Sequence, residues 1–190
     1  MRSEFYEVRW HGRGGQGVVT SSELLALAAL KEGKYVYHAP EFGPERRGAP
    51  VRAYTRVSHS PLELHSGIYE PDVVVVIDPS MQNEPSILAG IKRDGLLILN
   101  AKVPSEKITE YAKSHGISLW FVDAYSIAME VFGRPFYNTP MLGALVRASN
   151  LVSLDSVLSV VSERFSKDSK LAQLNILAIK RAYEEVRRHE

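Results

Sequence analysis

Three short apolar runs, each closed by a polar residue, constrain the fold of this 190-residue chain more than any other feature. The runs are residues 73–77, 96–99 and 118–122, and the residues that close them are Asp78, Asn100 and Asp123. Runs that are apolar on both faces are typical of central parallel strands covered by helices on both sides. Helical segments near 85–93 and 105–115 separate the runs. This alternation predicts an α/β protein, a three-layer α/β/α Rossmann-like sandwich around a mostly parallel central sheet.

The N-terminal part of the chain adds further strands to this sheet. Residues 6–11 alternate like a strand, residues 18–31 have helical spacing, and residues 35–38 form a short second strand before a loop over 39–50. Residues 51–57 alternate strictly, with Arg52, Tyr54 and Arg56 on one face. We therefore expect a strand there that runs antiparallel at one side of the sheet.

The C-terminal region is predicted to be helical. After Asp123 no strand pattern follows, and helices are expected over 124–131, 141–149, 154–165 and 171–188. Thr139 followed by Pro140 is a favourable helix start, with a cap residue and then a proline at the first helical position. The sequence contains no repeat and no linker, so we expect residues 1–190 to form a single domain.

The composition excludes several classes of protein. The chain contains no Cys, which excludes disulfides, Cys-held zinc or iron–sulfur sites and a Cys nucleophile. A formal net charge of +1 argues against nucleic acid as a partner, because such binding needs an excess of Lys and Arg. No apolar run approaches the ~20 residues that span a bilayer, and the first residues lack the apolar stretch of a secretory signal. We expect a cytoplasmic protein that binds neither nucleic acid nor membrane.

A glycine-rich loop connects the first strand to the first helix. It reads Gly12-Arg13-Gly14-Gly15-Gln16-Gly17 and fits the G-x-G-x-x-G dinucleotide fingerprint. Small residues there let backbone N–H groups approach an anion at the helix N-terminus. The fingerprint also needs an acidic residue at the end of the second strand, but Glu41, the nearest acid, lies beyond Pro40. A P-loop is excluded because Val18 and Val19 stand where it requires Lys and Ser or Thr.

Three interpretations of this loop stay open: a dinucleotide site, a tight turn that only packs the helix on the strand, and a contact with an anion or a partner. The loop holds four glycines in six residues, together with Arg13 and Gln16. That is more than a turn requires, so we favour the anion or partner contact.

A second loop carries adjacent arginines. It reads Phe42-Gly43-Pro44-Glu45-Arg46-Arg47-Gly48-Ala49-Pro50-Val51-Arg52. Arg46 and Arg47 suit bidentate binding of phosphate or carboxylate, because glycine and proline frame them in one place. Arg52, Tyr54 and Arg56 would extend the basic face along the next strand. The alternative is a solvated basic face in which Glu45 is the ion-pair partner.

Both loops are expected at the carboxyl edge of the parallel strands, where open α/β sheets bind ligands. The candidate anion site therefore comprises Gly12, Arg13, Gly14, Gly15, Gln16, Gly17, Arg46, Arg47, Asp78 and Asn100. The sequence has no Gly-x-Ser-x-Gly elbow, no HExxH and no Cys/His metal spacing. His11 and His38 are expected to have structural or hydrogen-bonding roles. We predict an anion-binding domain with no catalytic residue and no metal of its own.

Three segments of the sequence carry a resemblance to a known family. Arg9-Trp10-His11-Gly12-Arg13-Gly14-Gly15-Gln16-Gly17, the second loop from Phe42 to Arg52, and Asn138-Thr139-Pro140-Met141-Leu142-Gly143-Ala144 resemble the gamma subunits of 2-oxoacid:ferredoxin oxidoreductases, in particular the pyruvate:ferredoxin (pyruvate synthase) type. The resemblance covers the chain to about residue 150. It implies a non-catalytic or coenzyme A-recruiting subunit of an enzyme that converts a 2-oxoacid, coenzyme A and oxidised ferredoxin to acyl-CoA, CO2 and reduced ferredoxin.

The resemblance also implies partners and cofactors. Thiamine diphosphate, Mg2+ and [4Fe-4S] clusters would lie on alpha, beta and ferredoxin-like delta subunits, ferredoxin would accept the electrons, and coenzyme A would be a substrate held in part by the candidate anion site. This chain lacks the Gly-Asp-Gly of the thiamine diphosphate motif and any Cys for a cluster. The candidates for the subunit interface are Phe42, Gly43, Pro44, Glu45, Arg52 and Asn138.

Two further expectations follow. The isolated chain is predicted to be inactive, because the chemistry would depend on the partner subunits. The alternative function is that of a stand-alone Rossmann-like protein that binds a nucleotide or another anion through the glycine-rich loop.

Overall fold

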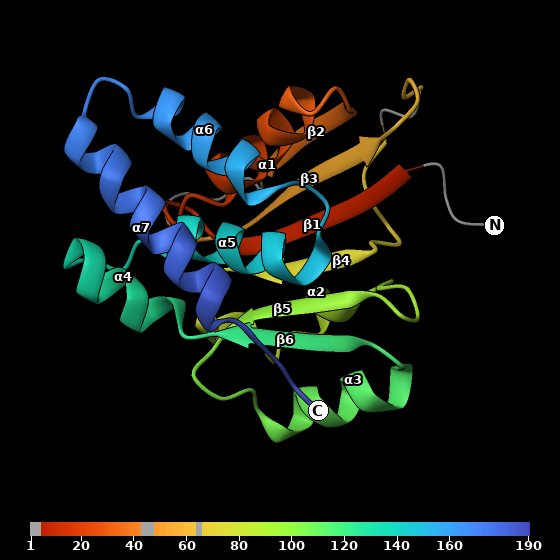
Figure 1. The fold of residues 1–190 in the computed structure, drawn as a ribbon. Coiled ribbons are helices and arrows are strands. Elements are labelled where there is room, and N and C mark those ends of the chain that lie inside the picture. The colour runs from red at the N-terminus through yellow and green to blue at the C-terminus, as the bar shows by residue number, and fades with distance from the viewer. Residues whose placement is uncertain (1–4, 43–47, 64–65) are drawn as a thin grey trace.

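A computed structural model describes residues 5–42, 48–63 and 66–190 of the chain (Figure 1). The strands are β1 (Phe5–Arg13), β2 (Tyr35–Phe42), β3 (Pro50–Ser58), β4 (Val73–Val76), β5 (Leu96–Asn100), β6 (Ser118–Val122) and β7 (Arg187–Arg188). The helices are α1 (Val18–Lys31), α2 (Pro85–Leu88), α3 (Glu106–His115), α4 (Ala124–Phe132), α5 (Asn138–Ser149), α6 (Leu154–Arg164) and α7 (Ser169–Glu185). A single 3-10 turn, η1 (Pro79–Met81), follows β4.

The strands form one seven-stranded sheet in the order β2-β3-β1-β4-β5-β6-β7. Strands β1, β4, β5 and β6 pair in parallel and make up its centre. Strand β3 runs antiparallel to both β1 and β2, and β7 runs antiparallel to β6 at the opposite edge. The predicted α/β class with a mostly parallel central sheet is confirmed.

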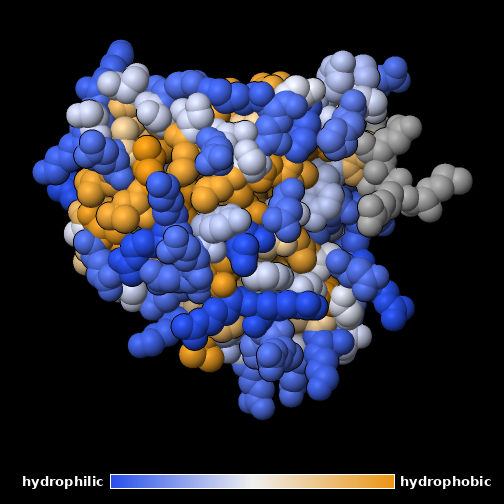
Figure 2. Space-filling model, viewed as in Figure 1, coloured by the Kyte–Doolittle hydropathy of each residue, from blue (hydrophilic) through white to orange (hydrophobic). Residues whose placement is uncertain are grey.

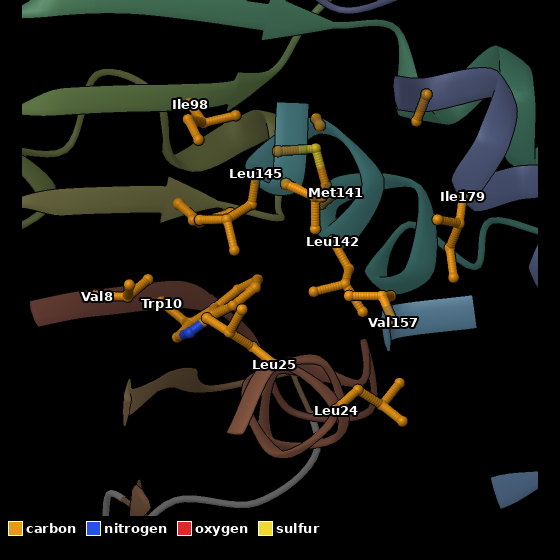
Figure 3. Packing of buried hydrophobic residues seen from close by; sticks show 14 of the residues in the cluster. Val8, Trp10, Leu24, Leu25, Ile98, Met141, Leu142, Leu145, Val157 and Ile179 are labelled. Atoms are coloured by element: carbon orange, nitrogen blue, oxygen red, sulfur yellow. The ribbon is translucent and has the colours of Figure 1, made fainter. Parts of the chain in front are cut away.

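Helices cover both faces of the central strands, which gives the three layers. On one face, Trp10 of β1 and Ile98 of β5 lie in a large apolar cluster with Leu25 of α1 and with Leu142 and Leu145 of α5 (Figure 3). Helices α6 and α7 pack on α1 and α5 from outside (Figure 1). A Cβ atom at Gly143 would collide with the backbone of Ile179, so this glycine lets α5 and α7 pack closely.

The other face divides into an apolar half and a charged half. Over β4, β5 and β6, the side chains of Val74, Leu97 and Leu119 pack with Ile87 of α2 and Ile108 of α3. Over β1 and β3, the same face carries the buried side chains Glu7, Arg9, His11 and Arg56. The sheet therefore buries charge on one side of its N-terminal half and apolar residues on the other.

The prediction of a basic face along β3 is wrong for Arg56. This side chain is only 2% exposed, and its guanidinium pairs with the Glu7 carboxylate at 2.7 Å. Tyr54 is also buried, and Arg52 alone of the three is half exposed. Alternation indicated correctly that these side chains share one face, but a charged neighbour on β1 neutralises Arg56 there.

Other boundaries also differ from the prediction. Strand β2 continues through Pro40 to Phe42 where a loop was expected, and proline is tolerated because β2 is an edge strand with one ladder partner. The strand expected at one side of the sheet, β3, lies between β2 and β1. The helix expected to reach residue 188 ends at Glu185, and Arg187 and Arg188 pair with β6.

Helix α5 begins one residue before Thr139, which is not its cap. The Thr139 hydroxyl donates to Asn175 Oδ1 of α7 at 2.8 Å and is buried. The Thr-Pro pair thus predicted the place of the helix start correctly. The Thr139 hydroxyl, however, does not cap the helix but joins α5 to α7.

Figure 2 shows the face covered by α5, α6 and α7, on which apolar side chains gather between hydrophilic ones. Within the described residues, no helix combines the length and the apolar character needed to cross a membrane.

Candidate functional site at the carboxyl edge of the sheet

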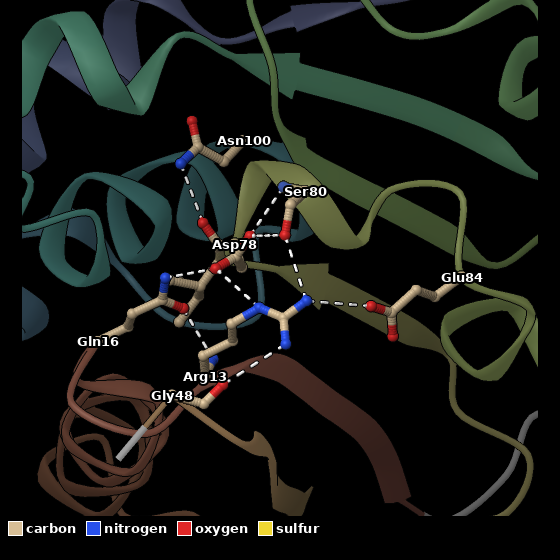
Figure 4. Close-up of polar contacts among 8 residues, drawn as sticks. Arg13, Gln16, Gly48, Asp78, Ser80, Glu84 and Asn100 are labelled. Atoms are coloured by element: carbon tan, nitrogen blue, oxygen red, sulfur yellow. Dashed lines mark hydrogen bonds and ion pairs between the residues drawn. The ribbon is translucent and has the colours of Figure 1, made fainter.

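Gln16 holds the glycine-rich loop in shape at the end of β1 (Figure 4). Its Oε1 atom accepts from the backbone N–H of Arg13 at 2.7 Å, and its Nε2 atom donates to Asp78 Oδ2 at 2.5 Å. The two bonds join Arg13, at the start of the loop, to Asp78, which lies two residues after the end of β4. The sequence predicted that the loop and Asp78 meet at the carboxyl edge, and the structure brings them together.

Asp78 is a connecting residue of this edge. Its Oδ1 atom accepts from the backbone N–H of Ser80 at 2.7 Å and from the Ser80 hydroxyl at 2.5 Å, and Arg13 Nε lies 3.5 Å from Oδ2. Burial raises the pKa of Asp78, but the bonds from Ser80 and Gln16 and the charge of Arg13 outweigh it and hold the pKa below its usual value. The carboxylate is therefore ionised and fully occupied by protein donors, and it positions the loop.

The Arg13 guanidinium is engaged by protein groups on several sides. Its Nη2 atom lies 3.3 Å from both Ser80 Oγ and Glu84 Oε1, and its Nη1 atom donates to the Gly48 carbonyl at 3.5 Å. The side chain is about one-third exposed, and so is Glu84. Such a partly exposed pair is weak, so an anion that approaches Arg13 can displace Glu84 at little cost.

The Asn100 side chain is buried. It is 2% exposed, and its Nδ2 atom donates to the Ile77 carbonyl at 2.9 Å. This bond fastens the end of β5 to the end of β4. The structure places Asn100 at the predicted edge but gives it a supporting role beneath the loop.

Two glycines of the loop are required by packing within the chain. Gly17 has φ +77°, and a Cβ atom there would lie 2.7 Å from Nδ2 of Asn138 on α5. A Cβ atom at Gly12 would lie 2.6 Å from the Val18 side chain. The tight-turn interpretation therefore accounts for Gly12 and Gly17, and Asn138, expected at a subunit interface, covers the loop from α5.

The β2–β3 hairpin is fastened to the glycine-rich loop. The N–H of Gly14 donates to the Ala49 carbonyl at 2.9 Å, and the N–H of Gly48 donates to the Gly14 carbonyl at 3.2 Å. The hairpin residues Gly43, Pro44, Glu45, Arg46 and Arg47 lie outside the described residues, and only the backbone of Phe42 is described. The chain on both sides of the arginine pair is thus anchored, and the C-terminal side is anchored directly to the loop.

The sheet order speaks against a dinucleotide site. In that fold the acidic residue follows a strand next to the one that leads into the glycine-rich loop. Here β3 separates β2 from β1, and Glu41 of β2 accepts from Tyr54 and pairs with Arg52 at 2.9 Å. Glu41 therefore lies two strands away from β1 and is engaged elsewhere.

His11 and His38 have the hydrogen-bonding roles expected of them. Arg9 Nε donates to His11 Nε2 at 2.9 Å, and burial, followed by the charges of Arg9 and Arg52, lowers the pKa of His11 to about 3. His38 Nε2 lies 2.8 Å from the Ser22 hydroxyl. A neutral imidazole that accepts a hydrogen bond from an arginine is a structural group.

Two residues of this edge, Ser80 and Glu84, were not found from the sequence. The signal for Ser80 was present, because Asp78-Pro79-Ser80 places an acidic cap, a proline and a hydroxyl in the order of a helix start. Glu84 carries no comparable signal, since its role depends on the turn after η1 that brings it to Arg13.

An iron–sulfur cluster or a metal site of three or more side chains does not fit the described residues. No group of three or more metal-ligating side chains occurs in the ranges 5–42, 48–63 and 66–190, and the whole sequence contains no Cys. The edge presents the N-terminus of α1, the partly exposed Arg13 and the hairpin bonded to the loop.

These features define a Rossmann-like α/β domain with the glycine-rich loop and the β2–β3 hairpin joined at the carboxyl edge of its sheet. The chain belongs to the family described as pyruvate ferredoxin/flavodoxin oxidoreductase, whose model matches residues 7–185. The family expected from the three sequence segments is thereby confirmed.

Relatives and solved structures agree with this membership. The chain is 46% identical over 178 residues to the common gamma subunit of pyruvate/ketoisovalerate oxidoreductases of Pyrococcus furiosus, covering 94% of this chain and 95% of that protein. It is 42% identical over 180 residues to pyruvate synthase subunit PorC of Methanothermobacter thermautotrophicus, covering 95% of each. The crystal structure of pyruvate oxidoreductase subunit PORC from Thermotoga maritima matches with a TM-score of 0.87 and 38% identity, covering 99% of this chain and all of that one. None of these supports the stand-alone alternative.

A more distant structure shares the fold. The 2-oxoglutarate:ferredoxin oxidoreductase from Magnetococcus marinus, solved with 2-oxoglutarate, coenzyme A and succinyl-CoA bound, matches with a TM-score of 0.80 and 21% identity. The match covers 96% of this chain and 31% of that one. The same fold thus occurs there within a longer chain.

We expect Gly17 and Asn138 to be energetically coupled. In the wild type, Gly17→Ala adds a steric clash, on the order of 1–3 kcal/mol, to a backbone cost of ~1–2 kcal/mol. In an Asn138→Ala background the clashes with Nδ2 and Cγ are gone, and the backbone cost remains together with the 3.0 Å approach to the Cβ atom of residue 138, so Gly17→Ala should cost less there. Urea unfolding of the single and double variants measures the difference. The matched control is Gly33→Ala, since Gly33 has φ +75° and no atom within 4 Å of its Cβ position. Equal costs in both backgrounds would show that Asn138 is not the reason for the glycine.

We expect Asp78 to make stability depend on acid pH. Because its pKa is lower in the folded than in the unfolded chain, its contribution is complete above about pH 5 and is lost as the pH falls through about 4 and below. Asp78→Asn should therefore lower the free energy of unfolding by ~1–3 kcal/mol at pH 7 and by clearly less at pH 3.5. Asp155→Asn, at an exposed position in the first turn of α6, should cost less than about 1 kcal/mol at pH 7, because it loses only an interaction with the helix dipole. If Asp78→Asn lowered the free energy of unfolding equally at both pH values, the lowered pKa of Asp78 would be contradicted.

Proposed function

We propose that this chain is the gamma subunit of a multi-subunit 2-oxoacid:ferredoxin oxidoreductase and that its carboxyl edge recruits coenzyme A. The observation that carries the proposal is the attachment of the β2–β3 hairpin to the glycine-rich loop through Gly14, Gly48 and Ala49. Gly48, the residue that follows the arginine pair in the sequence, is thereby bonded to the loop that leads into α1.

The chemistry of the edge suits the phosphates of coenzyme A. Helix α1 has no side-chain cap at Gly17 and no acidic residue in its first turn, so the positive end of its dipole is not neutralised there. Adjacent guanidinium groups bind a polyanion by charge-assisted, bidentate hydrogen bonds. Gln16 and Asp78 would act as positioning residues, because they fix the loop without donating to the ligand.

The remaining parts of the enzyme are assigned to other chains. We infer that alpha, beta and ferredoxin-like delta subunits carry thiamine diphosphate, Mg2+ and [4Fe-4S] clusters, with ferredoxin as electron acceptor. The absence of Cys from the sequence supports this division, since the chain has no thiolate for a cluster. Coenzyme A would be held for reaction with the acyl group formed elsewhere. The cytoplasmic location and the inactivity of the isolated chain stay predictions.

We expect Arg46→Ala and Arg47→Ala to raise the apparent KM for coenzyme A in the assembled enzyme. Each charge-assisted contact contributes on the order of 1.5–3 kcal/mol, which corresponds to about ten-fold or more. The KM for the 2-oxoacid should change little, and the effect should shrink at high salt if the pair is exposed. Steady-state kinetics with each substrate varied in turn measures both values.

Arg93→Ala is the matched control for these variants. Arg93 is exposed and precedes β5, so it lies at the opposite, amino edge of the sheet. Its removal should leave the KM for coenzyme A unchanged. If the Arg46 and Arg47 variants keep a normal KM but the complex dissociates on size exclusion, these arginines hold the subunits together and the coenzyme A proposal is wrong.

A further inference from the structure

A second cavity lies on the charged face of the sheet, away from the glycine-rich loop. It has a volume of about 460 Å³, within the range of small-molecule sites. Strands β1, β2 and β3 form its floor, and the segments around Tyr69 and Ala89 form its walls. None of its lining residues belongs to the glycine-rich loop or contacts Asp78.

Arg9 is the unusual group in this cavity. It is 4% exposed and lines the cavity from the middle of β1. Its Nη2 atom donates to the carbonyls of Ile87 and Ala89, at 3.1 and 2.6 Å, and its Nε atom donates to His11. In the part of the chain that the structure describes, no carboxylate pairs with this guanidinium and Nη1 has no acceptor. A buried cation without a counter-charge is costly, and proteins normally pair it.

The other charges of this face are already paired. Arg56 pairs with Glu7, and Lys92 pairs with Asp72 at 2.9 Å. Glu41 is held by Arg52 at 2.9 Å and by the Tyr54 hydroxyl. Two arginines and one glutamate line the cavity, so its lining has one positive charge in excess; the charge of Glu41 acts on Arg9 as well, but its hydrogen bonds go to Arg52 and Tyr54.

The walls of the cavity are built with little freedom. Gly90 has φ +71°, and a Cβ atom there would collide with the backbone carbonyl of Tyr69. The two wall segments are therefore packed against each other, and Arg9 ties one of them to the sheet through Ala89. Tyr37, Tyr54 and Tyr69 add aromatic surface to the lining.

We propose that this cavity binds a small organic anion, with its carboxylate or phosphate group on Arg9 and Arg52 and its remaining atoms against the tyrosines. The Nη1 atom of Arg9, which has no acceptor among the residues described, and the half-exposed guanidinium of Arg52 supply donors from two neighbouring strands. The proposal is independent of coenzyme A binding at the carboxyl edge, because the two sites share no residue.

An NMR titration of the full chain tests the site. Inorganic phosphate, acetate and citrate are added separately at constant ionic strength, and the Nε–Hε signals of the arginines and the backbone amides are recorded. We expect saturable shifts at Arg9 and on β1 and β3, with phosphate and the carboxylates competing for the same signals. Which probe binds more tightly distinguishes a phosphate from a carboxylate ligand.

Variants separate this site from other cations. Arg52→Gln should weaken binding about ten-fold, whereas Lys180→Gln, which removes an exposed charge on α7 across the sheet, should leave it unchanged. A variant that lacks both Arg46 and Arg47 should keep the shifts at Arg9. Arg9→Lys keeps the charge but loses the bonds to Ile87 and Ala89. Its affinity for the anions is compared with that of the wild type only if its NMR spectrum is that of a folded protein. Absence of saturable shifts, or equal binding by Arg52→Gln, overturns the proposal.

The assembled enzyme shows whether a small molecule or a partner chain fills the cavity. Phenylglyoxal modifies accessible arginines, and peptide mass spectrometry reports the extent at Arg52. We expect Arg52 to react in the complex and phosphate to slow its modification several-fold. If Arg52 is unreactive without phosphate, although it reacts in the free chain, a partner subunit covers the cavity and the proposal of a small anion is wrong.

Discussion

Strand β3 occupies the place beside β1 that a parallel strand takes in a dinucleotide-binding sheet, and both candidate sites depend on that placement. Because β3 pairs with β1 along its whole length, from Phe5↔Ser58 to Arg13↔Pro50, the hairpin that precedes it must turn at the carboxyl edge. The hairpin therefore meets the glycine-rich loop. Backbone hydrogen bonds from Gly14 to Ala49 and from Gly48 to Gly14 join the two. The same ladder places Tyr54 opposite Arg9 and so builds the floor of the second cavity.

The two arginines of β1 differ in how their charge is balanced. Arg13, at the end of the strand, has two carboxylates, Asp78 and Glu84, and is partly exposed. Arg9, in the middle of the strand, is buried, and its acceptors within the described ranges are carbonyls and an imidazole. At the carboxyl edge, Arg13 thus already has carboxylate partners, of which only Glu84 is easily displaced, so the proposed binding of a polyanion there depends mainly on Arg46 and Arg47. On the charged face, no carboxylate of the described residues forms an ion pair with Arg9.

Periodicity predicted which face each residue occupies but not its partner. The runs that end in Asp78 and Asn100 became central strands, since burial on both faces leaves no alternative to apolar residues. Pro40 concealed the second half of β2, because only the sheet order reveals that β2 is an edge. Arg56 pairs with Glu7, 49 positions away, and no local pattern reports such a contact. The glycine-rich loop and Asp78 were placed together from the strand pattern, whereas Ser80, Glu84 and the packing of Asn138 on Gly17 depend on tertiary structure.

The stability of the fold does not by itself explain Arg9. An apolar side chain at that position would extend the cluster of Val74, Leu97 and Ile87 on the same face, and replacing buried charge by packed apolar residues often stabilises a protein. The two carbonyls that Arg9 binds lie at the end of a four-residue helix, and such a turn is commonly closed by backbone bonds or water. A buried guanidinium beside a cavity, with one donor and its charge left unpaired by the residues described, is accounted for when the cavity itself receives a negative charge.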